Sequence, residues 1–153
     1  MAAGLNFWSI TYMQVVIGME PFDAQVSFIF IMITALIPGI VVGSSLVDYF
    51  GGYKENGMKN ALALGAAYAT AGNIFGVLMS FTMDETAFII YCWFLFFFGI
   101  PVMVISAGVL ITCVPKPAKN SASAVYNVFA NVVGLSLAPY VAGHVMELYS
   151  DRK

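Results

Sequence analysis

The chain alternates between long apolar segments and short polar breaks. The breaks fall at 20–23, 50–59, 84–85 and 115–119. Most of the apolar segments between them contain the roughly 20 residues that an α-helix needs to cross the hydrocarbon core of a bilayer. The pattern therefore predicts five membrane-spanning helices, at about 5–19, 24–49, 58–83, 87–114 and 122–147. The first of these is barely long enough, so an interfacial or truncated helix stays open there as an alternative.

Small residues are concentrated in two of the predicted spans. Ala35, Gly39 and Gly43 follow one another at steps of four, which places them on one side of a helix. The segment 58–83 is rich in Ala and Gly throughout. Small side chains allow helix backbones to approach closely in a membrane, so we expect both spans to pack tightly against neighbouring helices. Pro38 lies inside the first of the two and is expected to bend it.

A few polar residues indicate how the spans begin and how they pair. Pro21 cannot continue a helix from the preceding span, and Asp23 is therefore expected as the N-cap of the second span. Asn73 is the strongly polar residue inside the third span. We expect it to form a hydrogen bond to another helix, with contact to a ligand as the alternative.

Composition agrees with a membrane location. Hydrophobic residues make up 61% of the 153 residues and charged residues 9%. A soluble domain carries about 25% charged residues, so this chain lacks the side chains to cover a water-facing surface. We expect an all-α membrane protein in which residues 1–153 form a single partial transmembrane domain. The net charge of −2 gives no basis for a nucleic-acid partner.

The residue patterns that carry catalysis are missing from the sequence. No metal-ligand spacing, nucleophile–base pair or dinucleotide fingerprint is present, and the stretch from Gly51 to Lys54 lacks the spacing of a phosphate-binding loop. Cys92 and Cys113 lie on one predicted helix, roughly 30 Å apart at 1.5 Å per residue, which excludes a disulfide within it. We therefore expect no enzymatic activity, no cofactor and no metal.

The charges of the polar breaks alternate along the chain. The breaks at 20–23 and 84–85 carry acidic residues and neither Lys nor Arg. Four of the six basic residues fall in the other two breaks, namely Lys54, Lys59, Lys116 and Lys119. Basic loops favour the cytosolic side of a membrane, so these two breaks are predicted to face the cytosol in an integral, multi-pass protein of undetermined organelle. Arg152 and Lys153 fall on the opposite side and count against this orientation.

The break at the centre of the chain carries a recognisable pattern. It resembles the loop signature of major facilitator superfamily transporters, in which a small residue, Leu, Asp, Gly and several basic residues recur at fixed spacing between helices 2 and 3 and again, more weakly, between helices 8 and 9. The residues that match are Ser44 in place of the usual glycine, Leu46, Asp48, Gly51 and Lys54. Tyr49 and Gly52 replace two basic positions, which is similar to the weaker copy in the second half of the family.

The flanking spans extend the resemblance. Asn131 and Gly134, followed by Ala138-Pro139 and Gly143, are similar to helix 11 of spinster-like and organic-anion-transporter-like members. The stretch 7–13 resembles the end of helix 7 in the same group. The chain is therefore expected to correspond to helices 7 to 11 of the C-terminal half of a major facilitator fold.

The resemblance implies roles for several side chains. It implies that Asp48 latches the cytosolic side in one conformation; the alternative is a polar residue that merely ends a helix at the membrane surface. Trp8, Tyr12, Asn127 and Asn131 are the candidates for lining a substrate cavity. The alternative for the two asparagines is a hydrogen bond between helices.

Two functions follow as hypotheses. The first is transport of a small organic or lipid-like solute by alternating access, with the lipid bilayer, the solute and a missing transporter half or partner membrane subunits as partners. The second is a small structural multi-pass subunit of a larger membrane complex, with no transport of its own. A major facilitator transporter has about twelve helices, so the first hypothesis requires this chain to be a fragment or one part of an assembly.

Overall fold

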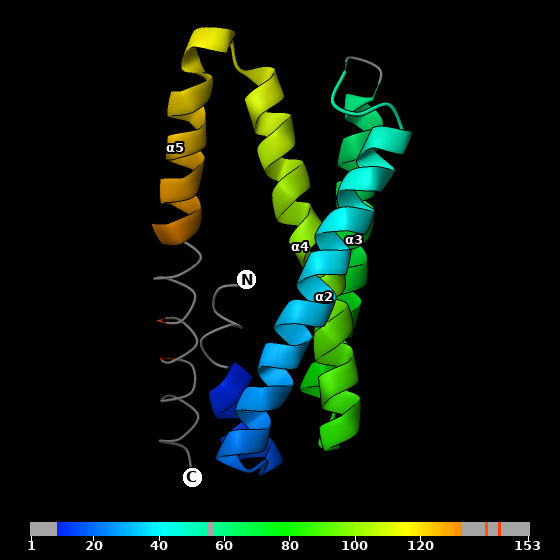
Figure 1. Ribbon diagram of the computed structural model, residues 1–153, viewed down its shortest axis with the longest axis vertical. Coiled ribbons are helices and arrows are strands. Elements are labelled where there is room, and N and C mark those ends of the chain that lie inside the picture. Colours follow the sequence, from blue (N-terminus) through cyan, green and yellow to red (C-terminus); the bar gives the residue numbers. More distant parts are fainter. Residues whose placement is uncertain (1–8, 55–56, 133–139, 141–143, 145–153) are drawn as a thin grey trace.

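The computed structural model describes residues 9–54, 57–132, 140 and 144. Within these residues it contains helices and no strand, which confirms the predicted all-α class. Figure 1 shows the elements in order: a π-helix η1 (Met13–Ile17), α2 (Pro21–Tyr49), α3 (Met58–Ser80), α4 (Glu85–Cys113), a 3-10 turn η2 (Lys116–Ala118) and α5 (Lys119–Ala130).

Three of these helices are long and apolar enough to cross a membrane. α2 and α4 have 29 residues each and α3 has 23, which at 1.5 Å per residue exceeds the roughly 30 Å of a hydrocarbon core. They correspond to the second, third and fourth predicted spans and support a membrane location. The described part of the first predicted span ends with η1, and that of the fifth contains α5, of 12 residues. The count of five spans stays a prediction.

The boundaries of the helices differ from the predicted ones in physically clear ways. α2 begins at Pro21 and not at 24, and Asp23 lies inside its first turn, so the expected Asp23 N-cap is wrong. Proline suits the first helical position because the N–H that it lacks would have no partner there. α4 begins at Glu85 because the Asp84 carboxylate accepts a hydrogen bond of 2.9 Å from the backbone N–H of Ala87. α5 begins at Lys119, directly after η2, and not at 122.

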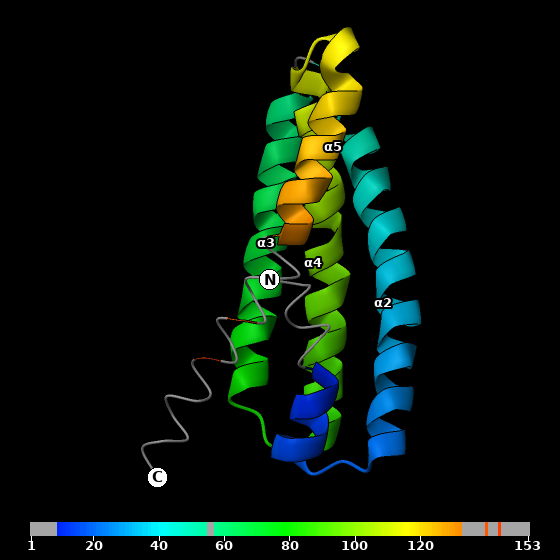
Figure 2. The same cartoon turned by 90° about the vertical axis from the view of Figure 1, so that its left-hand side faces the viewer.

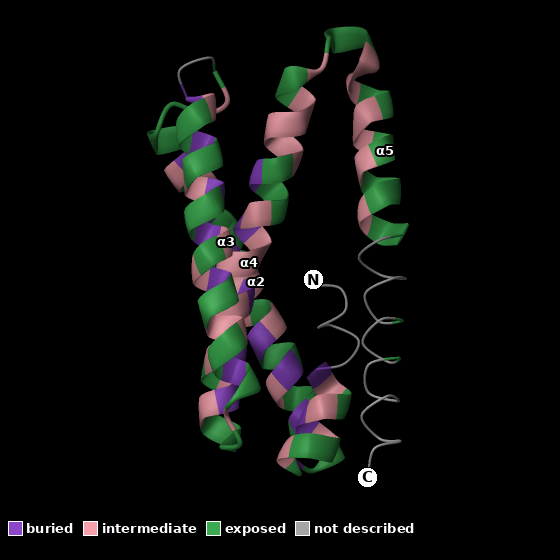
Figure 3. Cartoon of the chain, turned by 180° about the vertical axis from the view of Figure 1, so that it is seen from behind, coloured by how far each residue is buried: buried purple, intermediate pink, exposed green. Residues whose placement is uncertain are grey.

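α4 is the central helix of the molecule. It lies between α2 and α3 and packs against both along much of its length, whereas α2 and α3 touch each other little (Figure 2). Figure 3 shows that the buried positions form narrow stripes on helices that are otherwise exposed. The exposed side chains of α2 include Val26, Ile29, Ile33 and Ile37, which would be in contact with lipid. The core is therefore the pair of seams on either side of α4.

The seam between α2 and α4 is built from the predicted small-residue stripe. Ala35, Gly39 and Gly43 are all buried, as the spacing predicts. A methyl group on Gly39 would lie 2.7 Å from the backbone carbonyl oxygen of Phe97, and one on Gly43 would lie 2.5 Å from Cβ of Pro101. α2 and α4 cross at this point (Figure 1). Only glycine permits so close a crossing.

The seam between α3 and α4 is aromatic. The ring of Phe75 stacks on Phe94 at 4.8 Å and on Phe98 at 5.8 Å. Stacked and edge-on ring pairs contribute about 0.5–1.5 kcal/mol each beyond the area that they bury. Phe94 and Phe98 of α4 thus pack on α3, with Gly65 and Gly72 of α3 buried in the same seam.

A hydrogen bond joins the side chains of α2 and α4. The indole N–H of Trp93 donates to Oγ1 of Thr34 at 3.0 Å, and the Thr34 hydroxyl donates to the backbone carbonyl of Phe30 at 2.7 Å. Asn73, the residue expected to form such a bond, donates instead to the carbonyl of Ala69 in its own helix. The expected interhelical hydrogen bond of Asn73 is therefore wrong, and Trp93 and Thr34 form such a bond instead.

Replacing Thr34 by Val is expected to weaken the contact between α2 and α4. The change removes the acceptor for Trp93 while keeping the shape of the side chain, and such bonds within membranes contribute about 0.6 kcal/mol. The measurement is the free energy of unfolding in mixed micelles as SDS is increased. Thr70→Val is the matched control, since the Thr70 hydroxyl bonds only within α3, to Ala66. Equal losses from both variants would contradict the assignment.

The charged connectors are sorted to opposite ends of the molecule. The α2–α3 loop and the α4–α5 connector lie at the same end in Figure 1, and the starts of α2 and α4 lie at the other. Lys54, Lys59, Lys116 and Lys119 therefore share one end, as expected from the order of the spans. The assignment of that end to the cytosol stays a prediction.

Candidate functional site

The candidate site is the connector between α2 and α3, which contains the loop pattern. The backbone N–H of Gly51 donates to the carbonyl of Asp48 at 3.2 Å, and that of Gly52 donates to Val47 at 2.9 Å. These are the two bonds of a Schellman motif, which ends a helix through a residue in the left-handed region. Gly51 and Gly52 have φ angles of 103° and 65°. The glycine of the pattern is thus required by the end of α2.

Two further residues close the connector, and the sequence reading did not single them out. Gly57 lies against the backbone of Gly51 and Gly52, so closely that a methyl group on it would overlap their carbonyl oxygens. The side-chain amide of Asn60, in the first turn of α3, donates to the carbonyl of Phe50 at 3.2 Å. A third glycine within the polar break was the signal for Gly57. Nothing in the sequence indicated the partner of Asn60.

The apolar and hydroxyl members of the pattern have structural roles. Leu46 is half-buried and packs on a cluster formed by Val47, Ala61, Tyr68 and Ile105. The Ser44 hydroxyl donates within its own helix, to the carbonyls of Ile40 at 2.8 Å and Val41 at 3.1 Å. Neither side chain is available to a solute.

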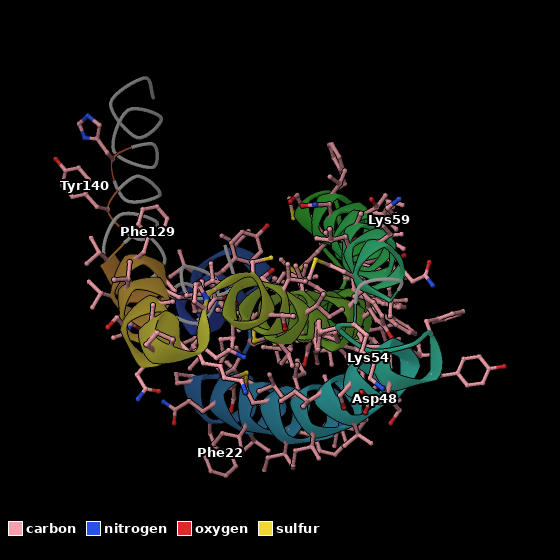
Figure 4. The ribbon with its side chains drawn as sticks, turned by 90° about the horizontal axis from the view of Figure 1, so that it is seen from above. Phe22, Asp48, Lys54, Lys59, Phe129 and Tyr140 are labelled. Carbon is pink, nitrogen blue, oxygen red and sulfur yellow. The ribbon has the colours of Figure 1, made fainter. Side chains whose placement is uncertain are left out.

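The charged members of the pattern are exposed. Asp48 lies in the last turn of α2 and Lys54 in the turn that follows, at the end of the molecule that faces the viewer in Figure 4. Within residues 9–54 and 57–132, the Asp48 carboxylate accepts no hydrogen bond and forms no ion pair. Of the matched residues, Asp48 and Lys54 are therefore the two whose side chains are free to engage a partner at this surface.

Tyr53 fastens the connector to α4. Its ring lies directly over Gly108, so that a methyl group there would overlap the ring. It also packs beside Val47 and Ile105. Burial, and secondly the negative charge of Asp48, raise the pKa of Tyr53. The connector is thus held from both sides, by Asn60 of α3 and by the contact with α4.

Three of the four cavity candidates are described, and Tyr12 lies on a different element from Asn127 and Asn131. Tyr12 is half-buried and stacks on Phe88, with ring centroids 5.4 Å apart. Asn127 and Asn131 are exposed on α5 and at its end. Trp8 lies outside the described residues. The proposed cavity stays a prediction.

A groove lies between the end of α4 and α5. It has a volume of about 470 Å³. Its walls are Leu110 and Val114 of α4 and Ala122, Val125, Tyr126 and Phe129 of α5. The Tyr126 hydroxyl donates to the backbone carbonyl of Met103 at 3.3 Å and joins the two helices beside the groove. The lining of this groove is almost entirely apolar, so the groove suits a hydrocarbon chain better than a polar solute.

The potential metal ligands of the described residues are scattered. Within it, no three His, Cys, Asp or Glu side chains gather closely enough to hold a metal ion. Cys92 is buried and Cys113 is exposed, and both are free thiols. The acidic and basic residues of α2, α3 and α4 lie in their first or last turns. The chemistry of this region is therefore that of packing and of charged connectors.

Comparison of the chain with protein-family models, with curated proteins and with solved structures finds no match in any of the three.

Proposed function

We propose that the chain forms part of a major facilitator transporter, corresponding to helices 7 to 11, that carries a small organic or lipid-like solute by alternating access. One observation carries the proposal. The residues that resemble the family's loop pattern lie at a tight connector between two membrane-length helices, which is where the family has that loop. The helices still needed for a complete transporter would come from further sequence or from a partner chain.

The packing of the long helices suits such a mechanism. Alternating access in this superfamily rocks one group of helices against another around a site near the midplane. The glycine crossing of α2 and α4 lets two backbones move past each other without side chains between them. Because α2, α3 and α4 carry no acidic or basic residue in their central turns, a proton relay would have to be located in other helices.

The role proposed for Asp48 is electrostatic. Its exposed carboxylate would form a contact with a basic residue of a neighbouring helix in one conformation and lose it in the other. The end of α2 and the connector are held by backbone hydrogen bonds and by Tyr53, so the backbone that carries the carboxylate stays in place while its partner would move.

Asp48→Asn is expected to slow transport by the complete protein roughly tenfold without lowering the amount in the membrane. A tenfold change corresponds to about 1.4 kcal/mol, which is the loss expected for one charge contact. The measurement is initial uptake at equal surface amounts. Glu85→Gln is the control, because Glu85 is an exposed acid at the opposite end. Unchanged turnover in Asp48→Asn would rule out the latch.

The transport proposal itself is tested with the protein encoded by the complete transcript, reconstituted in lipid vesicles. Uptake of a panel of radiolabelled organic anions and lysophospholipids is compared with uptake by protein-free vesicles. Saturable uptake of any member supports the proposal. Intact, correctly inserted protein with no saturable uptake of any member contradicts it.

A structural subunit is the second candidate, and the apolar character of the α4–α5 groove favours it. Chemical cross-linking in native membranes followed by mass spectrometry separates the two candidates. A subunit is expected to cross-link along its exposed helix faces to several membrane proteins of one complex. A transporter is expected to cross-link to helices of its own missing half.

A further inference from the structure

The α4–α5 groove, defined by the walls given above, opens beside a positively charged connector. Ala118 and Ser121 line its outer end. Lys116 and Lys119 are their neighbours in the chain, and the connector 115–119 contains no acidic residue. Lys116 is exposed and Lys119 half-exposed. The apolar groove therefore ends beside a connector that carries two lysines.

We propose that this groove binds an anionic phospholipid, with one acyl chain between α4 and α5 and the headgroup phosphate at Lys116 and Lys119. The apolar walls match the acyl chain. Basic pockets between membrane helices bind the headgroups of acidic lipids, and each Lys near the surface strengthens that attraction. The positive end of the α5 helix dipole lies at the same place and favours the same sign of charge.

The described length of the groove suits an acyl chain. From Ser121 to Phe129 the groove follows α5 for about 12 Å, at 1.5 Å per residue. That is close to the depth of one leaflet, which is half of the roughly 30 Å hydrocarbon core. The hydrogen bond from Tyr126 to Met103 joins α4 and α5 beside the groove.

The proposed site holds the headgroup and the acyl chain at different residues, so each part of the lipid is tested by its own variant. Lys116→Gln with Lys119→Gln removes the charges and leaves the walls. Ala122→Phe fills the groove and leaves the charges. The matched controls are Lys54→Gln with Lys59→Gln, which removes two charges from the other connector at the same end, and Ala124→Phe. Ala124 is exposed on α5 and does not line the groove.

The experiment measures lipid binding to the purified full chain by native mass spectrometry after release from nanodiscs. The nanodiscs contain palmitoyl-oleoyl phosphatidylglycerol and phosphatidylcholine in equal amounts. We expect one phosphatidylglycerol molecule to be retained, with a roughly thirtyfold preference over phosphatidylcholine. This is the ratio expected when two lysines each strengthen the attraction to the headgroup. The double Lys116/Lys119 variant is expected to lose the preference, and Ala122→Phe to lose the lipid. Both controls are expected to behave as wild type.

Three outcomes would overturn the proposal. One is equal retention of the two lipids by the wild type, and another is the same loss in the Lys54/Lys59 control as in the Lys116/Lys119 variant. The third is full retention by Ala122→Phe, with circular dichroism showing that it is as helical as Ala124→Phe. The site does not depend on transport, because binding is measured without solute; vesicle uptake and lipid retention can fail separately.

Discussion

Gly39→Ala is expected to disrupt the crossing of α2 and α4. The added methyl group would lie 2.7 Å from the backbone carbonyl oxygen of Phe97, and a backbone atom in the middle of a helix cannot turn away as a side chain can. Pro101 has no N–H, so the Phe97 carbonyl lacks its usual helical donor and points at α2 instead. Overpacking of this kind costs about 1–3 kcal/mol, and we expect the upper part of that range.

The measurement for Gly39→Ala is the free energy of unfolding in mixed micelles, followed by far-ultraviolet circular dichroism as SDS is added. Gly99→Ala is the matched control. Gly99 lies on α4 two residues from Phe97, and nothing lies within 4 Å of a methyl group placed there. Since Ala favours helix over Gly by about 1 kcal/mol, the control should be neutral or more stable. A loss of stability in Gly99→Ala as large as in Gly39→Ala would refute the crossing.

The helix faces were predictable from the sequence, and the pairing between them was not. Ala35, Gly39 and Gly43 could be assigned to one buried face because the helical period alone decides which residues share a side. Which helix would cover that face depends on the shape of α4, where Pro101 frees a carbonyl that only a glycine can approach. That complementarity joins residues about 60 positions apart, and a local pattern contains no trace of it.

The errors in the helix ends and in the hydrogen bonds have a common cause. The sequence pattern indicates a break at Pro21, although a proline is equally suited to begin a helix, and the two cases differ only in the direction of the chain beyond it. Asn73 is the expected interhelical donor because it is the most polar residue of its span. Its own helix satisfies it, while the less polar Thr34 faces Trp93 on α4.

The candidate site could be predicted in part. The position of the loop pattern, at the end of one long helix and before the next, followed from hydropathy and is confirmed. The structure divides the pattern into two groups. Leu46 and Gly51 are explained by packing and by the end of α2. The side chains of Asp48 and Lys54 have no such packing or helix-ending role. The functional part of the resemblance to transporters therefore depends on these two residues.

Gly57→Ala is the change expected to affect that connector most. The methyl group would lie 2.5 Å from the carbonyl oxygen of Gly51 and would overlap that of Gly52. Neither carbonyl can retreat, because both residues are already in the left-handed region and are held there by the bonds that end α2. We expect the connector to open, the Asn60–Phe50 hydrogen bond to break and stability to fall by about 2–3 kcal/mol.

Trypsin measures this opening directly, because Lys54 and Lys59 flank Gly57. Cleavage after these residues is expected to accelerate at least tenfold in Gly57→Ala, while cleavage after Lys119 in the other connector stays unchanged and serves as the internal standard. Gly52→Asn is the matched control: nothing lies within 4 Å of a methyl group at that position, and Asn tolerates the left-handed conformation. Rapid cleavage in Gly52→Asn as well would mean that the connector is held by its glycine conformations alone. Slow cleavage in both variants would mean that the contact of Gly57 with the end of α2 does not hold the connector closed.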